Sequence, residues 1–331
     1  MIHLRLLVPP ALVEETLRVL TDADSVSGIA HVPGASVRPE GDLVLADVAR
    51  EDASPLVAAL RDIGLAEEGC ISLETVESAI SARAREAEQA APGLPSDAVV
   101  WEEIEASTQE STELGVSYLA FMVIAMLIGA VGVMTDSPVL IIGAMVVGPE
   151  FGPLAGLCVA IVQRQRSLAW RSLNALAVGF ALGIAVTYFA TLVMRGTGIA
   201  PEAAAEASRP LTQFISDPGP FSAIVAFLAG VAGILSLTSA KSGALVGVLI
   251  SVTTIPAAAN VAVAGAYTEW PEFAGALEQL VLNLVMLVIA GLLTLLAQRR
   301  LAALQQRRRS ARPVAASGSR TREGDRLETP R

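Results

Sequence analysis

Hydrophobic and polar positions divide the chain into a short patterned part and a series of long apolar segments. Over the first 80 residues, stretches that alternate between apolar and polar positions are separated by two stretches with the 3.6-residue spacing of helices. The resulting order, βαββαβ, is that of ferredoxin-like domains, and we predict an α+β domain at residues 1–80. The predicted elements are, in order, residues 1–8, 9–22, 26–37, 41–50, 54–65 and 70–78.

Six apolar segments follow, each near the length of about 20 residues that a bilayer requires. We predict an α-helical polytopic membrane bundle at residues 117–298, preceded by a linker and an acidic juxtamembrane helix at 81–116. Residues 299–331 are predicted to form a basic, disordered C-terminal tail. The expected spans are residues 117–135, 138–163, 172–194, 221–239, 243–266 and 277–297.

Prolines interrupt the second and the fifth apolar segment. Pro149 and Pro153 stand about halfway along the second, and Pro256 stands in the fifth. Proline removes an N–H group and collides with the preceding turn, so the freed carbonyl groups need partners in neighbouring helices or in a wet cavity. We expect broken helices at both places.

The two interrupted segments indicate an internal repeat. Ser137 precedes Pro149 by twelve residues, and Ser242 precedes Pro256 by fourteen. Asn174 and Asn283 stand near the start of the third and sixth segments. Segments one to three therefore read as a copy of segments four to six, and an odd number of spans gives the copies opposite orientations. A 3+3 inverted repeat with paired broken helices is a common plan of secondary transporters.

Composition and charge support membrane residence and indicate an orientation. The chain is 53% hydrophobic, with a mean hydropathy of +0.57, and its net charge of -10 argues against nucleic acid as a partner. The N-terminus lacks the pattern of a signal peptide. Arginines concentrate in the loop after the second segment and after the last, so we expect a multi-pass plasma-membrane protein with both termini cytoplasmic. Recurring glycines favour tight packing and a homo-oligomer.

Residues 132–156, GVMTDSPVLIIGAMVVGPEFGPLAG, resemble the signature of a family of uncharacterised hydrophobic membrane proteins, domain-of-unknown-function family 389. The resemblance extends over residues 117–297 and implies a fold without implying an activity. Members often carry asparagine where Asp136 stands, an apolar residue where Glu150 stands, and a second proline beside the position of Pro256. This sequence departs from the family at all three positions.

Glu150, at the break in the second segment, is the first candidate for a substrate or ion site. An ionisable group at membrane depth is costly unless it is paired, protonated or hydrated. The alternative is a shallower break, where Glu150 faces water or caps the next half-helix. Thr253, Thr254 and Asn260 at the other break offer neutral oxygens that suit a polar solute or a dehydrated cation, and bonds between helices explain them equally well.

Two further candidates stand outside the breaks. Lys241 is the only lysine among 23 basic residues and either anchors an inside loop or pairs with a carboxylate or a substrate anion. Asp136, in the turn before the second span, reads as a helix cap, with a cation site as the sharper possibility. His3 and His31 lack companions at metal-ligand spacing, so no metal and no cofactor are expected.

The sequence favours a transporter or channel-like protein with a mid-membrane polar site for a small solute or ion and a cytosolic regulatory or assembly domain. The alternative is a non-transporting scaffold or sensor, whose cytosolic domain binds a ligand or partner. An enzyme is not expected, because the apolar segments contain no Ser/His pair, aspartate dyad or histidine cluster.

Overall fold

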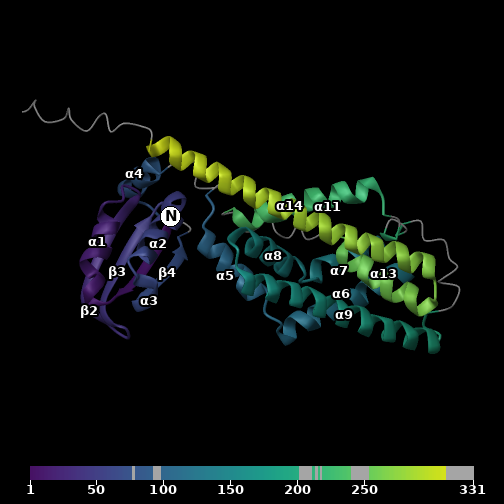
Figure 1. The fold of residues 1–331 in the computed structure, drawn as a ribbon. Helices are drawn as coiled ribbons and strands as arrows, with labels where there is room; N and C mark the ends of the chain where they lie inside the picture. Colours follow the sequence, from purple (N-terminus) through teal and green to yellow (C-terminus); the bar gives the residue numbers. More distant parts are fainter. Residues whose placement is uncertain are drawn as a thin grey trace, which may run out of the picture.

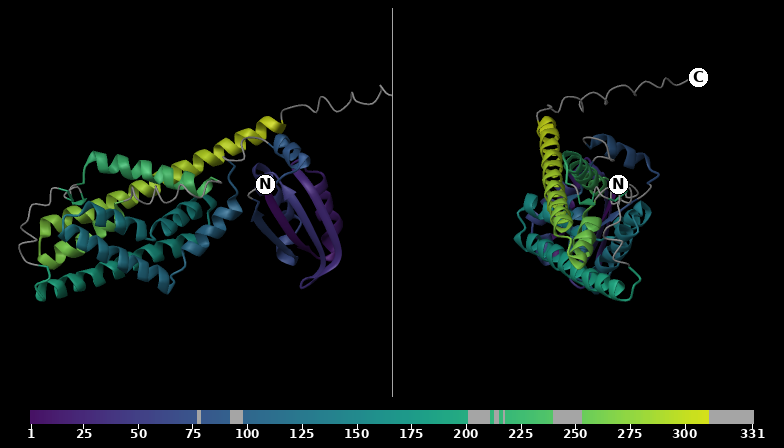
Figure 2. Two further views of the ribbon diagram at one scale, coloured as in Figure 1. Left: turned by 180° about the vertical axis from the view of Figure 1, so that it is seen from behind. Right: turned by 90° about the vertical axis from the view of Figure 1, so that its right-hand side faces the viewer.

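The computed structural model shows an N-terminal α/β domain beyond one end of a bundle of long helices (Figure 1). The last helix runs from the bundle to the level of that domain, in the front view and from behind (Figure 2). The structure describes residues 1–76, 79–91, 98–200, 211–212, 215–216, 218–239 and 253–310.

A four-stranded antiparallel sheet in the order β2-β3-β1-β4 forms the N-terminal domain. One helical connection joins β1 to β2 and another joins β3 to β4, so the predicted order βαββαβ is confirmed. The elements are β1 (Ile2–Val8), η1 (Pro10–Leu12), α1 (Val13–Thr21), β2 (Val26–Val37), β3 (Glu40–Val48), η2 (Arg50–Asp52), α2 (Ala53–Asp62), α3 (Leu65–Glu68) and β4 (Cys70–Thr75).

Alternation along the central strand β1 builds the core of this domain. Ile2, Leu4, Leu6 and Val8 are fully buried, whereas the residues between them are partly or fully exposed. Successive side chains of a strand point to opposite faces, so one face of β1 packs with the apolar residues of α1 and α2. This packing follows directly from the apolar and polar pattern of the sequence.

The Asp42 carboxylate ties the two strands of the β2–β3 hairpin together. It accepts hydrogen bonds from the Gly34 N–H at 2.8 Å and from His31 Nε2 at 2.6 Å. The Gly34 bond, together with His31, lowers the pKa of Asp42 below its ordinary value. The stabilisation is therefore present above the ordinary carboxyl pKa of about 3.9 and is lost as the pH falls through the lower pKa of the folded state.

We expect Asp42→Asn to raise amide hydrogen exchange in the β2–β3 hairpin several-fold at neutral pH, because the charged acceptor is lost. The difference from the wild type should begin to narrow below the ordinary carboxyl pKa of about 3.9 and disappear as the pH falls through the lowered pKa of Asp42. Exchange followed by mass spectrometry on the full chain across a pH series measures this. A difference that stays constant from neutral to acid pH would contradict the assignment.

Helix α5 (Trp101–Ser111) connects the N-terminal domain to the bundle; α4 (Ala82–Ala90) precedes it. Arg50, 8% exposed, binds Glu103 at 2.7 Å, and Ser54 donates to Glu102 at 2.6 Å. The predicted acidic helix is therefore present. Glu102 and Glu103 bind residues of the N-terminal domain, whereas Glu110 is exposed. On its other side α5 packs against α8, introduced below.

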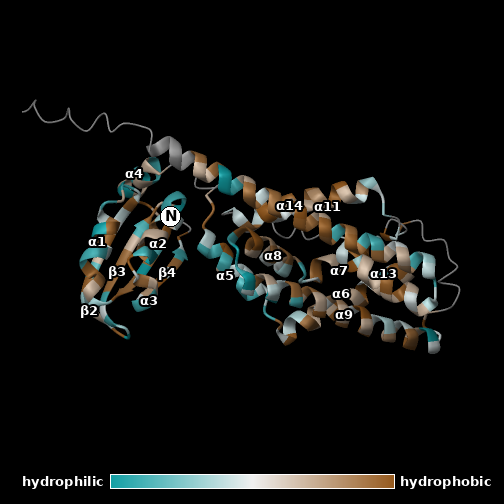
Figure 3. Cartoon of the chain, viewed as in Figure 1, coloured by the Kyte–Doolittle hydropathy of each residue, from teal (hydrophilic) through white to brown (hydrophobic). Residues whose placement is uncertain are grey.

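Among the described residues, four helices are long and apolar enough to cross a membrane, or five spans result if a bent pair is counted as one. The four are α6 (Val116–Met134), α9 (Arg166–Gly196), α11 (Pro220–Thr238) and α14 (Trp270–Ser310). The bent pair is α7 (Pro138–Val147) with α8 (Phe151–Gln163), which meet at 50°. Hydrophobic residues, coloured brown in Figure 3, are frequent along these helices.

The expected fifth span is described only over its second half. Helix α13 (Thr254–Tyr267) covers that half, and the preceding residues of the span lie outside the described residues. The chain is therefore a mostly helical protein with apolar helices suited to a membrane and a small antiparallel N-terminal sheet.

Helix α14 corrects the predicted start of the C-terminal tail. It continues to Ser310, so the first part of the segment 299–331 is helical and not disordered. Its leucine, alanine, glutamine and arginine residues all favour helices, and charge on a solvated helix does not end it. Residues 311–331 lie outside the described part of the chain.

Candidate functional site

The break in the second apolar segment consists of Gly148, Pro149 and Glu150, between the end of α7 and the start of α8. Gly148 has extended backbone angles, which turn the chain out of the first helix. Pro153 lies in the first turn of α8 and Pro256 in the first turn of α13, where a proline N–H is not needed. These two prolines therefore begin half-helices, and Pro149 lies in the break itself.

Glu150 is buried at this break, with only 4% of its surface exposed. The Thr254 hydroxyl, at the start of α13, donates a hydrogen bond to Glu150 Oε1 at 2.6 Å. The other oxygen, Oε2, is buried and has no hydrogen-bond partner among the described residues. A Cβ at Gly148 would displace the side chain of Glu150 or that of Ile255. Glu150 neither faces water nor caps α8 through its side chain.

The helices α8 and α13 both begin next to the Glu150 side chain and run in opposite directions. Glu150 precedes the first residue of α8 and contacts the first residue of α13. Figure 1 shows α8 directed toward the N-terminal domain and α13 toward the far end of the bundle. The N-terminus of a helix carries a partial positive charge. Two such termini therefore flank the Glu150 carboxylate.

A row of polar side chains extends from the break between α13 and α14, and we call it the polar seam. Asn283 donates to the Thr253 hydroxyl at 2.7 Å, and Gln279 donates to Asn283 at 3.1 Å. Farther along, Asn260 donates to Glu272 at 3.2 Å. These side chains connect the region of Glu150 with the start of α14.

Two oxygens of the polar seam lack donors. Asn260 Oδ1 and Gln279 Oε1 are buried without a hydrogen-bond partner in the described part of the chain, as is Glu150 Oε2. Each of the three residues is at most 4% exposed. Buried acceptors of this kind carry a desolvation cost of about 1–3 kcal/mol each. The site therefore offers oxygen acceptors to whatever occupies it.

The structure brings Thr254 onto Glu150, with Thr253 next to it, whereas Asn260 lies six residues farther along α13 and bonds to Glu272. Gln279 and Glu272 also belong to the region and were not among the sequence candidates. They stand four and eleven residues before Asn283, which places all three on one face of α14. That spacing was the signal in the sequence that could have identified them.

Asp136 does not cap the second span. Asp136 has a positive φ of 46°. Its Oδ1 accepts hydrogen bonds from the Thr212 N–H at 2.9 Å and from the Thr212 hydroxyl at 2.8 Å. The N-cap residue of α7 is Ser137. Asp136 instead holds the connection before α11, because its backbone turns the carboxylate away from the helix that follows. Lys241 lies outside the described residues.

The ends of α8 and α13 repeat each other at a spacing of 104 residues. Arg164 and Thr268 end these helices with positive φ angles of 60° and 61°. Both helices close with the same two backbone bonds. They are Arg164 N to Ile161 O with Gln165 N to Ala160 O, and Thr268 N to Gly265 O with Glu269 N to Ala264 O.

Two arginines extend the same correspondence across the bundle. Arg195 of α9 donates to the Ala266 carbonyl at 2.7 Å, and Arg299 of α14 donates to the Val162 carbonyl at 3.0 Å. Arg299 follows Arg195 by 104 residues, and Ala266 follows Val162 by the same number. Each arginine thus binds the end of the half-helix from the other part of the chain. Glu150 and its partner Thr254 are also 104 residues apart.

Comparison with known proteins finds a similarity over part of the chain to a domain without a known activity. Residues 145–289 match the family model described as a domain of unknown function (DUF389). The match runs from α7 into α14 and includes the break at Glu150 and helix α13, so the resemblance noted from residues 132–156 is confirmed. No curated protein and no solved structure was found to match the chain.

Proposed function

We propose that the protein transports a cation or a proton across the plasma membrane, through a polar site where two broken spans meet. The observation that carries this proposal is Glu150, a carboxylate buried at the break with one oxygen that has no partner among the described residues. Ionisable groups inside membrane segments commonly mark ion and proton pathways. We assign no catalytic role to the protein.

The spacing of 104 residues supports a 3+3 inverted repeat of six spans. The half-helix α8 packs against α9 and α14, and α13 packs against α14 and α9, as a two-fold relation requires. The same relation is supported by the two arginines, because Arg195 of the first half binds α13 and Arg299 of the second half binds α8. The register makes Pro149 equivalent to Thr253, three residues away from the pairing with Pro256 that the sequence suggested.

The donors and acceptors of the site favour a positively charged substrate. The helix N-termini of transporters often bind anionic groups, but here Glu150 already lies between them. The remaining unpaired groups, on Glu150, Asn260 and Gln279, are oxygen acceptors. A cation or a proton satisfies such oxygens, whereas an anion would be repelled by Glu150.

Arginines support an orientation with both termini in the cytoplasm. Arg164, Arg166 and Arg171 lie between α8 and the apolar part of α9, and Arg299 and Arg300 follow the apolar part of α14. Arg299 binds the Val162 carbonyl at the end of α8, and α8 packs against α5, the helix that joins the N-terminal domain to the bundle. Basic residues near the ends of spans favour the cytoplasmic side. We therefore infer that the N-terminal domain is cytoplasmic.

Purified protein in liposomes tests the proposal directly. We expect flux of protons, or of one of the cations sodium, potassium and magnesium, that exceeds protein-free liposomes and saturates with ion concentration. A pH-sensitive dye and ion-sensitive dyes inside the vesicles report it. Absence of flux for all four ions in correctly folded protein would contradict transport and favour the alternative, a scaffold or sensor in which α5 relays ligand binding by the N-terminal domain.

A further inference from the structure

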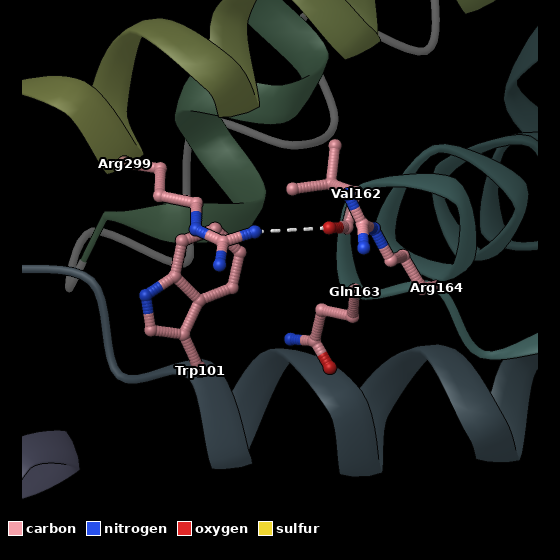
Figure 4. A pocket seen from close by; sticks show the side chains of 5 residues that line it. All are labelled: Trp101, Val162, Gln163, Arg164 and Arg299. Carbon is pink, nitrogen blue, oxygen red and sulfur yellow. Dashed lines mark hydrogen bonds between the residues drawn. The ribbon is translucent and has the colours of Figure 1, made fainter.

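A cavity of about 580 Å³ lies where three helices meet at the end of the bundle nearest the N-terminal domain. Trp101 lines it from the start of α5, Val162, Gln163 and Arg164 from the end of α8, and Arg299 from α14 (Figure 4). It lies far from Glu150, with the whole length of α8 between them. The cavity is therefore separate from the site proposed for transport.

The charge of this cavity is positive. Arg164 and Arg299 contribute two guanidinium groups, and its five lining residues include no carboxylate. The acidic residues that follow Trp101 are directed elsewhere, because Glu102 binds Ser54 and Glu103 binds Arg50 of the N-terminal domain. The third carboxylate of α5, Glu105, binds Gln165. These carboxylates thus take the hydrogen bonds named here from residues that do not line the cavity.

The cavity also offers neutral donors. Gln163 uses its amide oxygen to accept a bond from Gln165 at 2.9 Å, which leaves its NH₂ group to donate. The Trp101 indole carries an N–H donor on an apolar ring. Arg299 is fixed by its bond to the Val162 carbonyl, shown as a dashed line in Figure 4, and still has further N–H groups.

At the opposite end of the bundle, an aromatic ring packs against the corresponding arginine. There the equivalent arginine, Arg195, lies over the Tyr267 ring, 5.0 Å from its centroid. The residue 104 positions before Tyr267 is Gln163, which lines the cavity at the near end. The aromatic ring that covers the arginine at one end is therefore replaced by a smaller, polar side chain at the other.

The depth of the cavity indicates where its ligand comes from. Arg299 stands two residues after Ala297, where the apolar part of α14 ends, and Arg164 ends the apolar helix α8. Both arginines therefore lie at the level at which apolar helices leave a membrane, where lipid phosphates are concentrated. Arginine binds phosphate oxygens through two parallel N–H bonds, and tryptophan is enriched at this level.

We propose that this cavity binds a phosphate group, held by Arg164 and Arg299 with Gln163 and Trp101 beside it. The group belongs either to an anionic lipid or to a soluble phosphate compound. A bound phosphate joins α5, which carries the N-terminal domain, to α8 and α14.

Thermal unfolding of the full chain in a neutral detergent tests the site with three probes. These are short-chain phosphatidylglycerol, phosphatidylcholine of the same chain length, and inorganic pyrophosphate. A ligand that binds the folded state raises the melting temperature in proportion to its affinity. We expect stabilisation by phosphatidylglycerol or pyrophosphate, or by both, and less by phosphatidylcholine. Stabilisation by the lipid alone identifies a headgroup site, and stabilisation by pyrophosphate alone identifies a soluble ligand.

Variants of the lining residues test whether this stabilisation comes from binding in the cavity. We expect Arg164→Asn and Trp101→Leu each to lower the affinity for the probe that stabilises the wild type by about tenfold or more, as the loss of a hydrogen bond to a charged group predicts. Arg164 is exposed and has a positive φ that asparagine tolerates, so this variant should fold. Arg300→Gln is the matched control, because it removes an exposed arginine adjacent to Arg299 that does not line the cavity. No stabilisation by either anionic probe, or equal weakening by Arg300→Gln, would overturn the proposal.

Discussion

Replacing Glu150 by glutamine is expected to reduce ion flux by about 100-fold or more, with little loss of stability. Glutamine has nearly the same shape and keeps an oxygen that can accept the Thr254 bond. It removes the negative charge that would hold a cation or a proton, an interaction worth several kcal/mol in a buried site. A neutral amide is cheaper to bury than a carboxylate, so the folded state should be at least as stable as the wild type.

The measurement is ion flux into liposomes across a pH series, together with the melting temperature of each variant. Glu110→Gln is the matched control, because Glu110 is an exposed carboxylate on α5, away from the break. We expect it to leave flux and its pH dependence unchanged. If Glu150→Gln shows wild-type flux at every pH, Glu150 does not take part in transport.

Alanine at Gly230 is expected to destabilise the bundle by about 1–3 kcal/mol, because the added methyl group overpacks a helix contact. A Cβ at Gly230 of α11 would lie 2.7 Å from the Ala290 Cβ and 3.0 Å from the Leu287 carbonyl oxygen of α14. The carbonyl belongs to a helix backbone and cannot move aside without shifting α14. Gly230 therefore sets the distance between two spans.

Gly143→Ala is the matched control for this substitution. Gly143 is also in the middle of an apolar helix, α7, but a Cβ there meets nothing within 4 Å. The alanine should therefore stabilise the protein by about 0.5–1 kcal/mol through helix propensity. Unfolding in mixed micelles at increasing fractions of denaturing detergent measures both variants. Equal effects at positions 143 and 230 would show that packing between α11 and α14 does not limit stability.

The sequence predicted the features that follow from local physics. The alternation of Ile2, Leu4, Leu6 and Val8 identified the central strand, because a strand exposes alternate side chains to opposite faces. Gly148 and Pro149 identified the break in the second segment, because neither favours a helix interior. Glu150 stood out as an ionisable residue among apolar ones, and the structure places it at that break.

Features that depend on tertiary contacts were beyond the sequence. The prolines suggested one register for the proposed repeat, whereas the spacing of 104 residues between the helix ends and between the arginine contacts supports another. Asp136 resembled a helix cap, and a turn with positive φ directs it to Thr212 instead. Glu272 binds Asn260 of another helix, and Gln279 binds Asn283 one turn farther along α14; composition alone does not identify such pairs.

The length of α14 has a mechanical consequence. Its 41 residues correspond to a rod of about 60 Å, roughly twice the thickness of a bilayer core. It contacts the half-helix α13 along one part and reaches the level of the N-terminal domain with the other (Figure 1). A tilt of about 5° over an arm of about 30 Å displaces the free end by roughly 3 Å. In the proposed transporter, a shift of α14 at its contact with α13 would therefore also move the part of the helix beside the N-terminal domain.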